Sequence, residues 1–126
     1  MKEKKLPPPR VLQHLEKIRE LARQKGYFLN PDTEHTYALV ESLLVNMDRY
    51  GYPSCPCRLA AGKREEDRDI ICPCDYRDAD LAEYGTCFCA LYVNEEIAGG
   101  IGEAAPIPER RPAIEERRKK GKPVPP

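Results

Sequence analysis

The six cysteines of this 126-residue chain constrain its fold more than any other feature of the sequence. All of them lie between residues 55 and 89, in three C-x-C doublets: Cys55-Pro56-Cys57, Cys72-Pro73-Cys74 and Cys87-Phe88-Cys89. In two of the doublets a proline stiffens the backbone between the cysteines. Six sulfur atoms at this density predict that three loops converge on one compact centre.

The composition narrows the setting in which this centre would work. Lysine plus arginine and aspartate plus glutamate both number 21, so no net basic charge favours nucleic acid. No apolar run approaches the roughly 20 residues that span a bilayer, and the start MKEKKLPPPR lacks the apolar segment of a signal peptide. We therefore expect a cytoplasmic protein without a membrane or nucleic-acid partner. In a reducing cytosol, clustered cysteines indicate metal binding or catalysis more often than structural disulfides.

Two amphipathic helices are predicted ahead of the cysteines. The first ends at Lys25-Gly26, and the second begins at Asn30-Pro31-Asp32, with Asn30 as the N-cap, and ends near residue 50. The apolar residues at helical spacing are Val11, Leu12, Leu15, Ile18 and Ala22, then Tyr37, Val40, Leu44 and Met47, with Leu43 alongside. Both helices are expected to supply core. His14 and His35 lie on them, outside the cysteine region, and are expected at the surface.

The segments between and after the doublets are shorter. Residues 58–71 are mostly charged and predict a solvated loop or short helix. Residues 75–84 predict one or two helical turns that end at Gly85, with Asp75 or Asp78 as the cap. The apolar residues 89–93 are expected to pack back on the two helices.

The composition changes near the C-terminus. Residues 103–126 hold six prolines, seven basic residues and four acidic residues, which predicts a flexible, disordered tail or one that wraps a partner. The sequence therefore predicts a mainly α-helical fold, with a small multihelical domain over residues 1–102 and a Pro-rich charged tail over residues 103–126.

Several kinds of centre are compatible with the three doublets. Cysteines at positions i and i+2 rarely bond each other, because their side chains point to opposite faces of an extended chain, but cross-pairing would still give three disulfides. A structural zinc site takes four ligands and leaves two cysteines without a redox use. A [4Fe-4S] cluster also takes four thiolates, and a dithiol beside it can exchange electrons with it. The count of four plus two indicates electron transfer coupled to thiol–disulfide chemistry, although the spacing leaves open which two cysteines are the spare pair.

The ordered doublets resemble those of a known family. CPCR, then CPC, then a third C-x-C look like the catalytic (beta) chain of ferredoxin–thioredoxin reductase, and so does the tract LLVNMDRYGYPSCPCR around the first doublet. The resemblance covers roughly residues 10–95, including the layout of helices followed by a cysteine tract. It implies a mainly helical fold in which a small multihelical domain caps an iron–sulfur cluster.

The resemblance also implies a role for each cysteine. The ligands of a [4Fe-4S] cluster would be Cys55, Cys72, Cys74 and Cys87. The remaining two, Cys57 and Cys89, would form the redox-active disulfide. Cys57 would be the exposed thiol that attacks the partner, and Cys89 would lie against the cluster.

The function implied by the resemblance is that of a ferredoxin:thioredoxin (disulfide) reductase. Ferredoxin would supply electrons one at a time, the cluster would hold the half-reduced state, and the Cys57 thiolate would attack the disulfide of thioredoxin or a glutaredoxin-like protein. A second electron would free Cys89 to resolve the mixed disulfide. Arg58, the neighbour of Cys57, would either lower the pKa of that thiol or face solvent. A further variable subunit, as in plants, stays open.

Two features depart from the family pattern. Plant and cyanobacterial members have Cys-His-Cys as the third doublet, whereas this chain has Phe88 in the middle, which cannot titrate. Another group or solvent would then have to handle protons near the disulfide. The first gap between doublets is also shorter, at 14 residues, and the second longer, at 12, which resembles divergent members from anaerobic bacteria and archaea.

Three other classes stay open on the sequence alone. A non-catalytic [4Fe-4S] electron carrier or redox sensor would have the cluster's colour without thioredoxin turnover. A structural zinc-binding module would be colourless and contain zinc but no iron. A secreted disulfide scaffold would have no free thiols. Iron, sulfide and zinc analysis of anaerobically purified protein separates the cluster proteins from the zinc module and the disulfide scaffold, and thioredoxin turnover separates the two cluster proteins.

Overall fold

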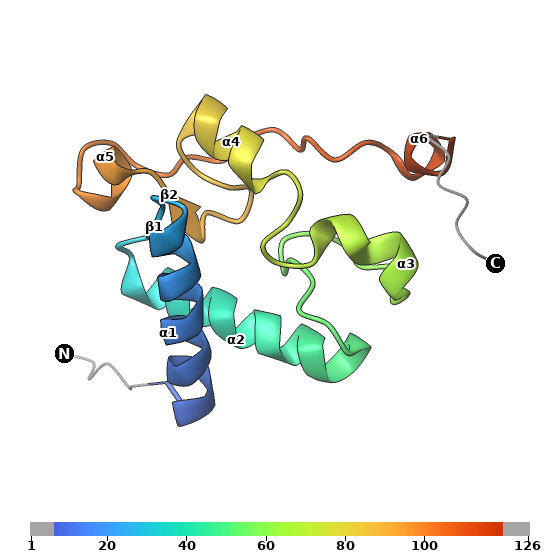
Figure 1. The fold of residues 1–126 in the computed structure, drawn as a ribbon, viewed down its shortest axis with the longest axis horizontal. Helices are drawn as coiled ribbons and strands as arrows, with labels where there is room; N and C mark the ends of the chain where they lie inside the picture. The colour runs from blue at the N-terminus through green and yellow to red at the C-terminus, as the bar shows by residue number, and fades with distance from the viewer. Residues whose placement is uncertain (1–6, 120–126) are drawn as a thin grey trace.

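A computed structural model of the chain describes residues 7–119, and its largest elements are two packed helices (Figure 1). α1 (Pro9–Gln24) and α2 (Thr33–Tyr50) contact each other directly. Their apolar faces supply much of the hydrophobic core: Val11, Leu15, Ile18, Ala22, Leu39, Val40, Leu43 and Leu44. The expected mainly helical fold and the two predicted helices are confirmed.

The buried face of α2 differs in part from the predicted stripe. Val40, Leu43 and Leu44 are buried as expected, Leu39 joins them, and Met47 is only half-buried. The face is displaced because α2 packs both on α1 and on residues of the cysteine region within one continuous core. The spacing of apolar residues within α2 alone does not reveal that the helix also packs on the cysteine region.

The start of α2 corrects a prediction. Asp32 is the N-cap, since its Oδ1 accepts a hydrogen bond from the His35 amide at 3.2 Å. Asn30 was expected in this role, but its side chain accepts from the Asp32 amide and donates to the carbonyl of Ala90, both at 2.9 Å. Asn30 therefore links α2 to a distant turn instead of capping the helix.

Short elements carry the cysteine half of the chain, as expected. They are α3 (Arg64–Asp67), η1 (Arg68–Ile70), α4 (Arg77–Tyr84), β2 (Tyr92–Val93) and α5 (Glu95–Ala98). β1 (Phe28–Leu29), between the two long helices, pairs antiparallel with β2. This pairing attaches the end of the cysteine region to the helix pair, and the predicted packing of residues 89–93 is confirmed by the burial of Leu91, Tyr92 and Val93.

The limits of α4 confirm one expectation and correct another. The helix ends at Gly85, whose φ of 80° lies in the left-handed region that favours glycine. Neither Asp75 nor Asp78 caps its start, where Tyr76 holds the N-cap position without a side-chain hydrogen bond. The Asp78 carboxylate instead accepts a hydrogen bond from the Tyr27 hydroxyl at 2.9 Å. This contact ties α4 to the residues that follow α1.

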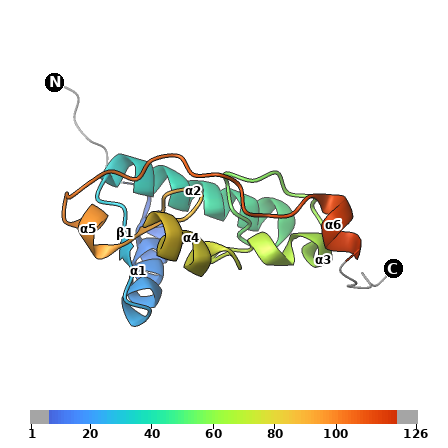
Figure 2. The same ribbon diagram turned by 90° about the horizontal axis from the view of Figure 1, so that it is seen from above.

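The segment after α5 returns across the cysteine half. In both views it passes α4 and reaches the end of the molecule where α3 lies, and there it forms α6 (Ile114–Lys119) (Figure 2). The composition of this segment did not indicate that it would run along the rest of the domain. Residues 120–126, the rest of the predicted tail, lie outside the described residues, as do residues 1–6. None of the described helices is long and apolar enough to cross a bilayer.

Candidate redox site

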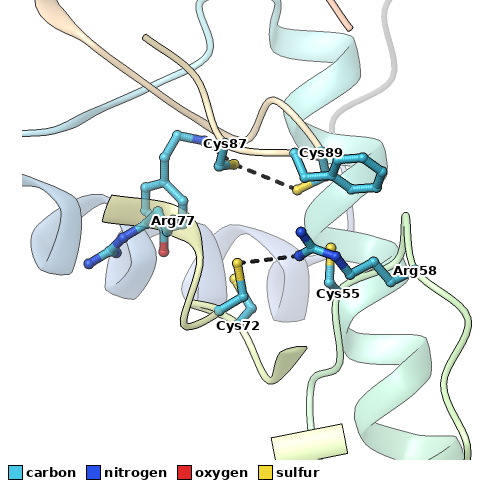
Figure 3. Close-up of a pocket in the computed structure, with 9 residues that line it drawn as sticks. Cys55, Arg58, Cys72, Arg77, Cys87 and Cys89 are labelled. Carbon is cyan, nitrogen blue, oxygen red and sulfur yellow. Dashed lines mark hydrogen bonds between the residues drawn. The ribbon is translucent and has the colours of Figure 1, made fainter. Parts of the chain in front are cut away.

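The cysteines of all three doublets meet at one small pocket. It is lined by Cys55, Cys72, Cys74, Cys87 and Cys89, with Arg58, Arg77, Phe88 and Tyr92. The labelled cysteine side chains in Figure 3 point toward one another from different loops. Cys57, the sixth cysteine, is exposed. The predicted convergence of three loops on one centre is therefore present in the fold.

Backbone hydrogen bonds hold the first two doublets side by side. The Cys55 amide donates to the carbonyl of Ile70 at 2.8 Å, and the Cys72 amide donates to the carbonyl of Pro53 at 2.9 Å. These two bonds join residues that are 15 or more positions apart in the sequence. They fix the relative position of the two loops without help from any bound group.

Two polar side chains, one in the first turn of α2 and one just before the helix, hold the third doublet. Residues 87–90 form a tight turn in which the Ala90 amide donates to the carbonyl of Cys87 at 2.9 Å. His35 Nε2 lies 3.0 Å from the Cys89 carbonyl oxygen, and Asn30 Nδ2 donates to the Ala90 carbonyl at 2.9 Å. The expectation that His35 lies at the surface away from the cysteines was wrong, because the chain folds back over the start of α2.

Arg58 is buried beneath the cysteine loops, so the solvent-facing alternative is wrong. Its side chain is 2% exposed, and its guanidinium lies 5.3 Å from the ring centre of Tyr76 and 4.6 Å from that of Phe88. Nη1 donates to Cys74 Sγ at 3.4 Å, and Nε and Nη2 each donate to the Glu109 carboxylate at 2.8 Å. Phe88, the middle residue of the third doublet, thus contacts a fixed cation.

The thiols differ in acidity because of their neighbours. Hydrogen bonds with the Cys55 and Cys89 thiols lower the pKa of Cys57 to about 3, and the charge of Arg58 acts in the same direction. Contacts with the Cys55, Cys57 and Cys87 thiols raise the pKa of Cys89 well above its usual range, and burial adds to this. The exposed Cys57 is therefore the thiol best suited to act as a nucleophile.

The surroundings of the proposed ligands suit bound thiolates. Cys74 Sγ accepts a hydrogen bond from Arg58, and Cys87 Sγ accepts one from the Tyr92 amide at 3.3 Å. N–H donors to ligand sulfur stabilise the thiolate form that binds metal. The buried Tyr92 hydroxyl belongs to the lining of the same pocket and lies against the Cys72 thiol. An O–H donor at this place suits a thiolate at Cys72.

A cofactor at this pocket would take its ligands from thiols. Cys55, Cys72, Cys74 and Cys87 all line it, and four thiolates are the donor set of a [4Fe-4S] cluster. The donor chemistry and the N–H donors to sulfur therefore fit such a cluster. Within the described part of the chain, no group of three His, Cys, Asp or Glu side chains is arranged around a single ion position.

Several residues at this site were not found by sequence reasoning. Asn30, His35 and Glu109 are far from the cysteines in the chain, and Tyr92 was expected only to pack. None of them belongs to a motif. Only the return of β2 and of the C-terminal segment to the cysteines brings them there.

A small helical domain in which an exposed thiol of low pKa lies beside a buried thiol of high pKa defines a thiol-based redox protein. Residues 9–117 match the family described as the ferredoxin thioredoxin reductase catalytic beta chain, and the chain belongs to this family. It is an oxidoreductase of that type, as the ordered doublets predicted.

Relatives with the name "ferredoxin-thioredoxin reductase, catalytic chain" have similar sequences. That of Pyropia yezoensis is 31% identical over 100 residues, which cover 75% of this chain and 83% of the relative. That of Porphyra purpurea is 31% identical over 77 residues, covering 60% and 62% of the two chains. That of Guillardia theta is 31% identical over 77 residues, covering 60% and 72%.

Proposed function

We propose that this chain uses electrons from ferredoxin to reduce the disulfide of thioredoxin or a thioredoxin-like protein. The reacting pair is Cys57 and Cys89, and a [4Fe-4S] cluster is held by Cys55, Cys72, Cys74 and Cys87. The observation that carries the proposal is the contrast within the pair: Cys57 is exposed with a lowered pKa, and Cys89 is buried with a raised one. The names of the relatives supply the donor and the acceptor.

The reduction of the partner uses only the two thiols of the pair. The Cys57 thiolate attacks one sulfur of the partner's disulfide, which forms a mixed disulfide and releases the other partner sulfur as a thiolate that takes a proton. Cys89 then loses its proton and attacks the Cys57 sulfur. The Cys57–Cys89 disulfide forms, the partner leaves as a dithiol, and two electrons have passed to it.

The regeneration of the Cys57 thiolate and the Cys89 thiol from their disulfide requires two electrons and one proton. Ferredoxin supplies one electron at a time, and the cluster, when bound, supplies a one-electron store beside the disulfide. Cys89 Sγ lies 3.9 Å from Cys87 Sγ, so the buried half of the pair is next to a proposed ligand. The burial of Cys89 keeps water and foreign thiols away from this side, while Cys57 stays open to the partner.

Anaerobic purification with iron, sulfide and zinc analysis tests the cofactor. We expect about four irons and four sulfides per chain, as in a [4Fe-4S] cluster. A colourless protein that contains zinc and no iron would overturn the proposal. A protein with the cluster but no turnover of thioredoxin would instead be an electron carrier.

Two serine variants test the division of labour among the cysteines. Cys57→Ser is expected to keep its iron and to abolish disulfide reduction, because only the nucleophile is lost. Cys72→Ser is expected to lose or destabilise the cluster, because a ligand is lost. The assignment is wrong if both variants keep full reductase activity.

A further inference from the structure

Three consecutive residues of the C-terminal segment bind three separate parts of the cysteine half. Each forms an ion pair with an N–O distance of 2.8 Å, and the pairs are Glu109 with Arg58, Arg110 with Asp80, and Arg111 with Asp69. Arg110 also pairs with Glu83 of α4. These ion pairs attach the C-terminal segment to the cysteine half at three places.

The burial of these pairs separates them from ordinary surface ion pairs. The side chains of Arg58 and Asp80 are 2% and 0% exposed, and that of Arg111 is 8% exposed. Exposed pairs contribute little to stability, but the loss of one partner of a buried charge leaves that charge without compensation. The domain therefore contains buried charges whose oppositely charged partners in these ion pairs come from the C-terminal segment.

The residues that receive these contacts lie next to the cysteines. Arg58 directly follows Cys57, Asp69 precedes Cys72 by three positions, and Asp80 belongs to α4, which begins shortly after Cys74. The Arg111 guanidinium donates twice to Asp69, at 2.8 and 3.1 Å. The C-terminal segment thus adds charged side-chain contacts to loops that backbone hydrogen bonds already place side by side.

Glu109 has the most direct effect on the pocket. Its carboxylate accepts from both Nε and Nη2 of Arg58, which leaves Nη1 to donate to Cys74 Sγ. A carboxylate bound in this two-point manner fixes the plane of a guanidinium. Glu109 is therefore a positioning residue, which acts on the cysteine through Arg58.

We infer that residues 109–111 are an anchoring segment that holds the cysteine loops in place before any cofactor binds. The anchoring segment acts through its three ion pairs and does not itself touch the reacting sulfurs. The inference rests on the proposed function only for the statement that these loops carry cluster ligands. The loops themselves, and the ion pairs that hold them, belong to the chain without its cofactor.

Hydrogen–deuterium exchange of the full-length, reduced, iron-free chain tests the anchoring segment. Glu109→Gln and Arg111→Gln are each expected to raise the exchange rates of amides in residues 55–60 and 68–76 about tenfold, because each removes charged hydrogen bonds to a buried group. The amides of α1 are expected to keep their protection. Each variant loses one charge; Glu109→Gln keeps the shape of the side chain, whereas Arg111→Gln also shortens it, as does its matched control.

Matched controls come from the same segment. Glu103 is exposed and forms no ion pair within residues 7–119, so Glu103→Gln controls for Glu109→Gln. The Arg117 guanidinium donates to the carbonyl of Pro112 at 2.6 Å, within its own segment, so Arg117→Gln controls for Arg111→Gln. Both controls are expected to leave exchange in the cysteine loops at the wild-type rate.

The outcomes separate the inference from the proposed function. Equal exchange in test and control variants would overturn the inference, and so would a loss of protection in α1 as large as that in the loops. The conservative variant Arg111→Lys, which keeps the charge, is expected to restore part of the protection. A wild-type chain that takes up no iron would overturn the proposed function but would leave the exchange result standing.

Discussion

The helix pair and the cysteine half of this protein are held together by different interactions. α1 and α2 bury apolar side chains against each other and satisfy their backbone groups within each helix. The cysteine half has short elements, and its loops are fixed by hydrogen bonds and ion pairs between residues far apart in the chain. The first arrangement relies mainly on apolar burial, whereas the second relies mainly on polar partners that distant parts of the chain supply.

This difference between the two halves explains why the reactive thiols lie on the loops and not on the helix pair. A helix face that fills the core leaves no thiol accessible, while a loop fixed at several points can expose one cysteine and bury its neighbour. Arg58 is the example: its burial anchors the first doublet, and the residues on either side of it, Cys57 and Leu59, are exposed. Function lies on loops held by a rigid scaffold, as in many enzymes.

The largest effect on stability is expected in the helix pair. Leu43→Ala removes a side chain that is 1% exposed and should lower the free energy of unfolding by about 2–5 kcal/mol. Urea denaturation measures this. Val45→Ala, at a position of the same helix that is 45% exposed, is the control and should cost roughly 0.5 kcal/mol or less. Equal losses would show that the helix pair is not the stable half.

The next effect concerns thiol acidity in the cysteine half. Because the pKa of Cys57 is lowered, its thiolate persists as the pH falls and is lost only when the pH passes below that pKa. In the reduced, iron-free chain at pH 6, iodoacetamide should therefore alkylate Cys57 about a hundredfold faster than Cys72, whose pKa is raised by burial. Mass spectrometry of the peptides measures both rates.

An ordinary thiol provides the contrast for this measurement. With a pKa of about 8.5, its alkylation slows about tenfold for each pH unit below 8. Cys57 should instead react at a nearly constant rate between pH 8 and pH 6. A tenfold decrease per unit over that range would contradict the hydrogen bonds assigned to its sulfur.

The next smaller effect on stability compares a buried carboxylate in the cysteine half with an exposed one on the helix pair. Asp67 is fully buried and accepts from the Tyr52 hydroxyl at 2.5 Å and from the Ala61 and Gly62 amides at 2.9 and 3.0 Å. Asp67→Asn puts an amide donor where an acceptor is needed, and should cost about 2 kcal/mol. Asp48→Asn, in an exposed pair with Arg10 on the helix pair, should change the stability little because solvent screens this pair.

Thermal unfolding of both aspartate variants gives the measurement. The melting temperature should fall clearly for Asp67→Asn and stay close to the wild-type value for Asp48→Asn. Similar decreases in the two variants would mean that the carboxylate of Asp67 does not organise its loop.

The smallest expected effect is that an Ala→Gly substitution stabilises the protein at a position in the cysteine half and destabilises it at a position in the helix pair. Ala90 has a φ of 63°, a left-handed conformation that strains any residue with a Cβ, so Ala90→Gly should stabilise the protein by about 0.5 kcal/mol. Ala38 is exposed within α2, where Ala38→Gly should destabilise it by about 1 kcal/mol. Denaturant titration of both variants tests the pair, and two changes of the same sign would contradict it.

Much of the helix pair could be predicted because its determinants are local. The spacing of apolar residues and the glycines at positions 26 and 51 define both helices within a residue or two. The exception is the N-cap of α2, where Asn30 was expected and Asp32 is found. Asn30 is used by the turn at Ala90, a contact over 60 positions that no local pattern contains.

The sequence by itself determined the two long helices, the helical turns between the doublets, and the membership in a cysteine-based redox family. These follow from periodicity, caps and the count and order of cysteines, all of which are written in neighbouring residues. Only the tertiary structure decided that Arg58 is buried, that His35 meets the third doublet, and that residues 109–111 return to the cysteine loops. Long-range contacts depend on how the elements pack, and a charged segment has the same composition whether it binds a buried partner or only water.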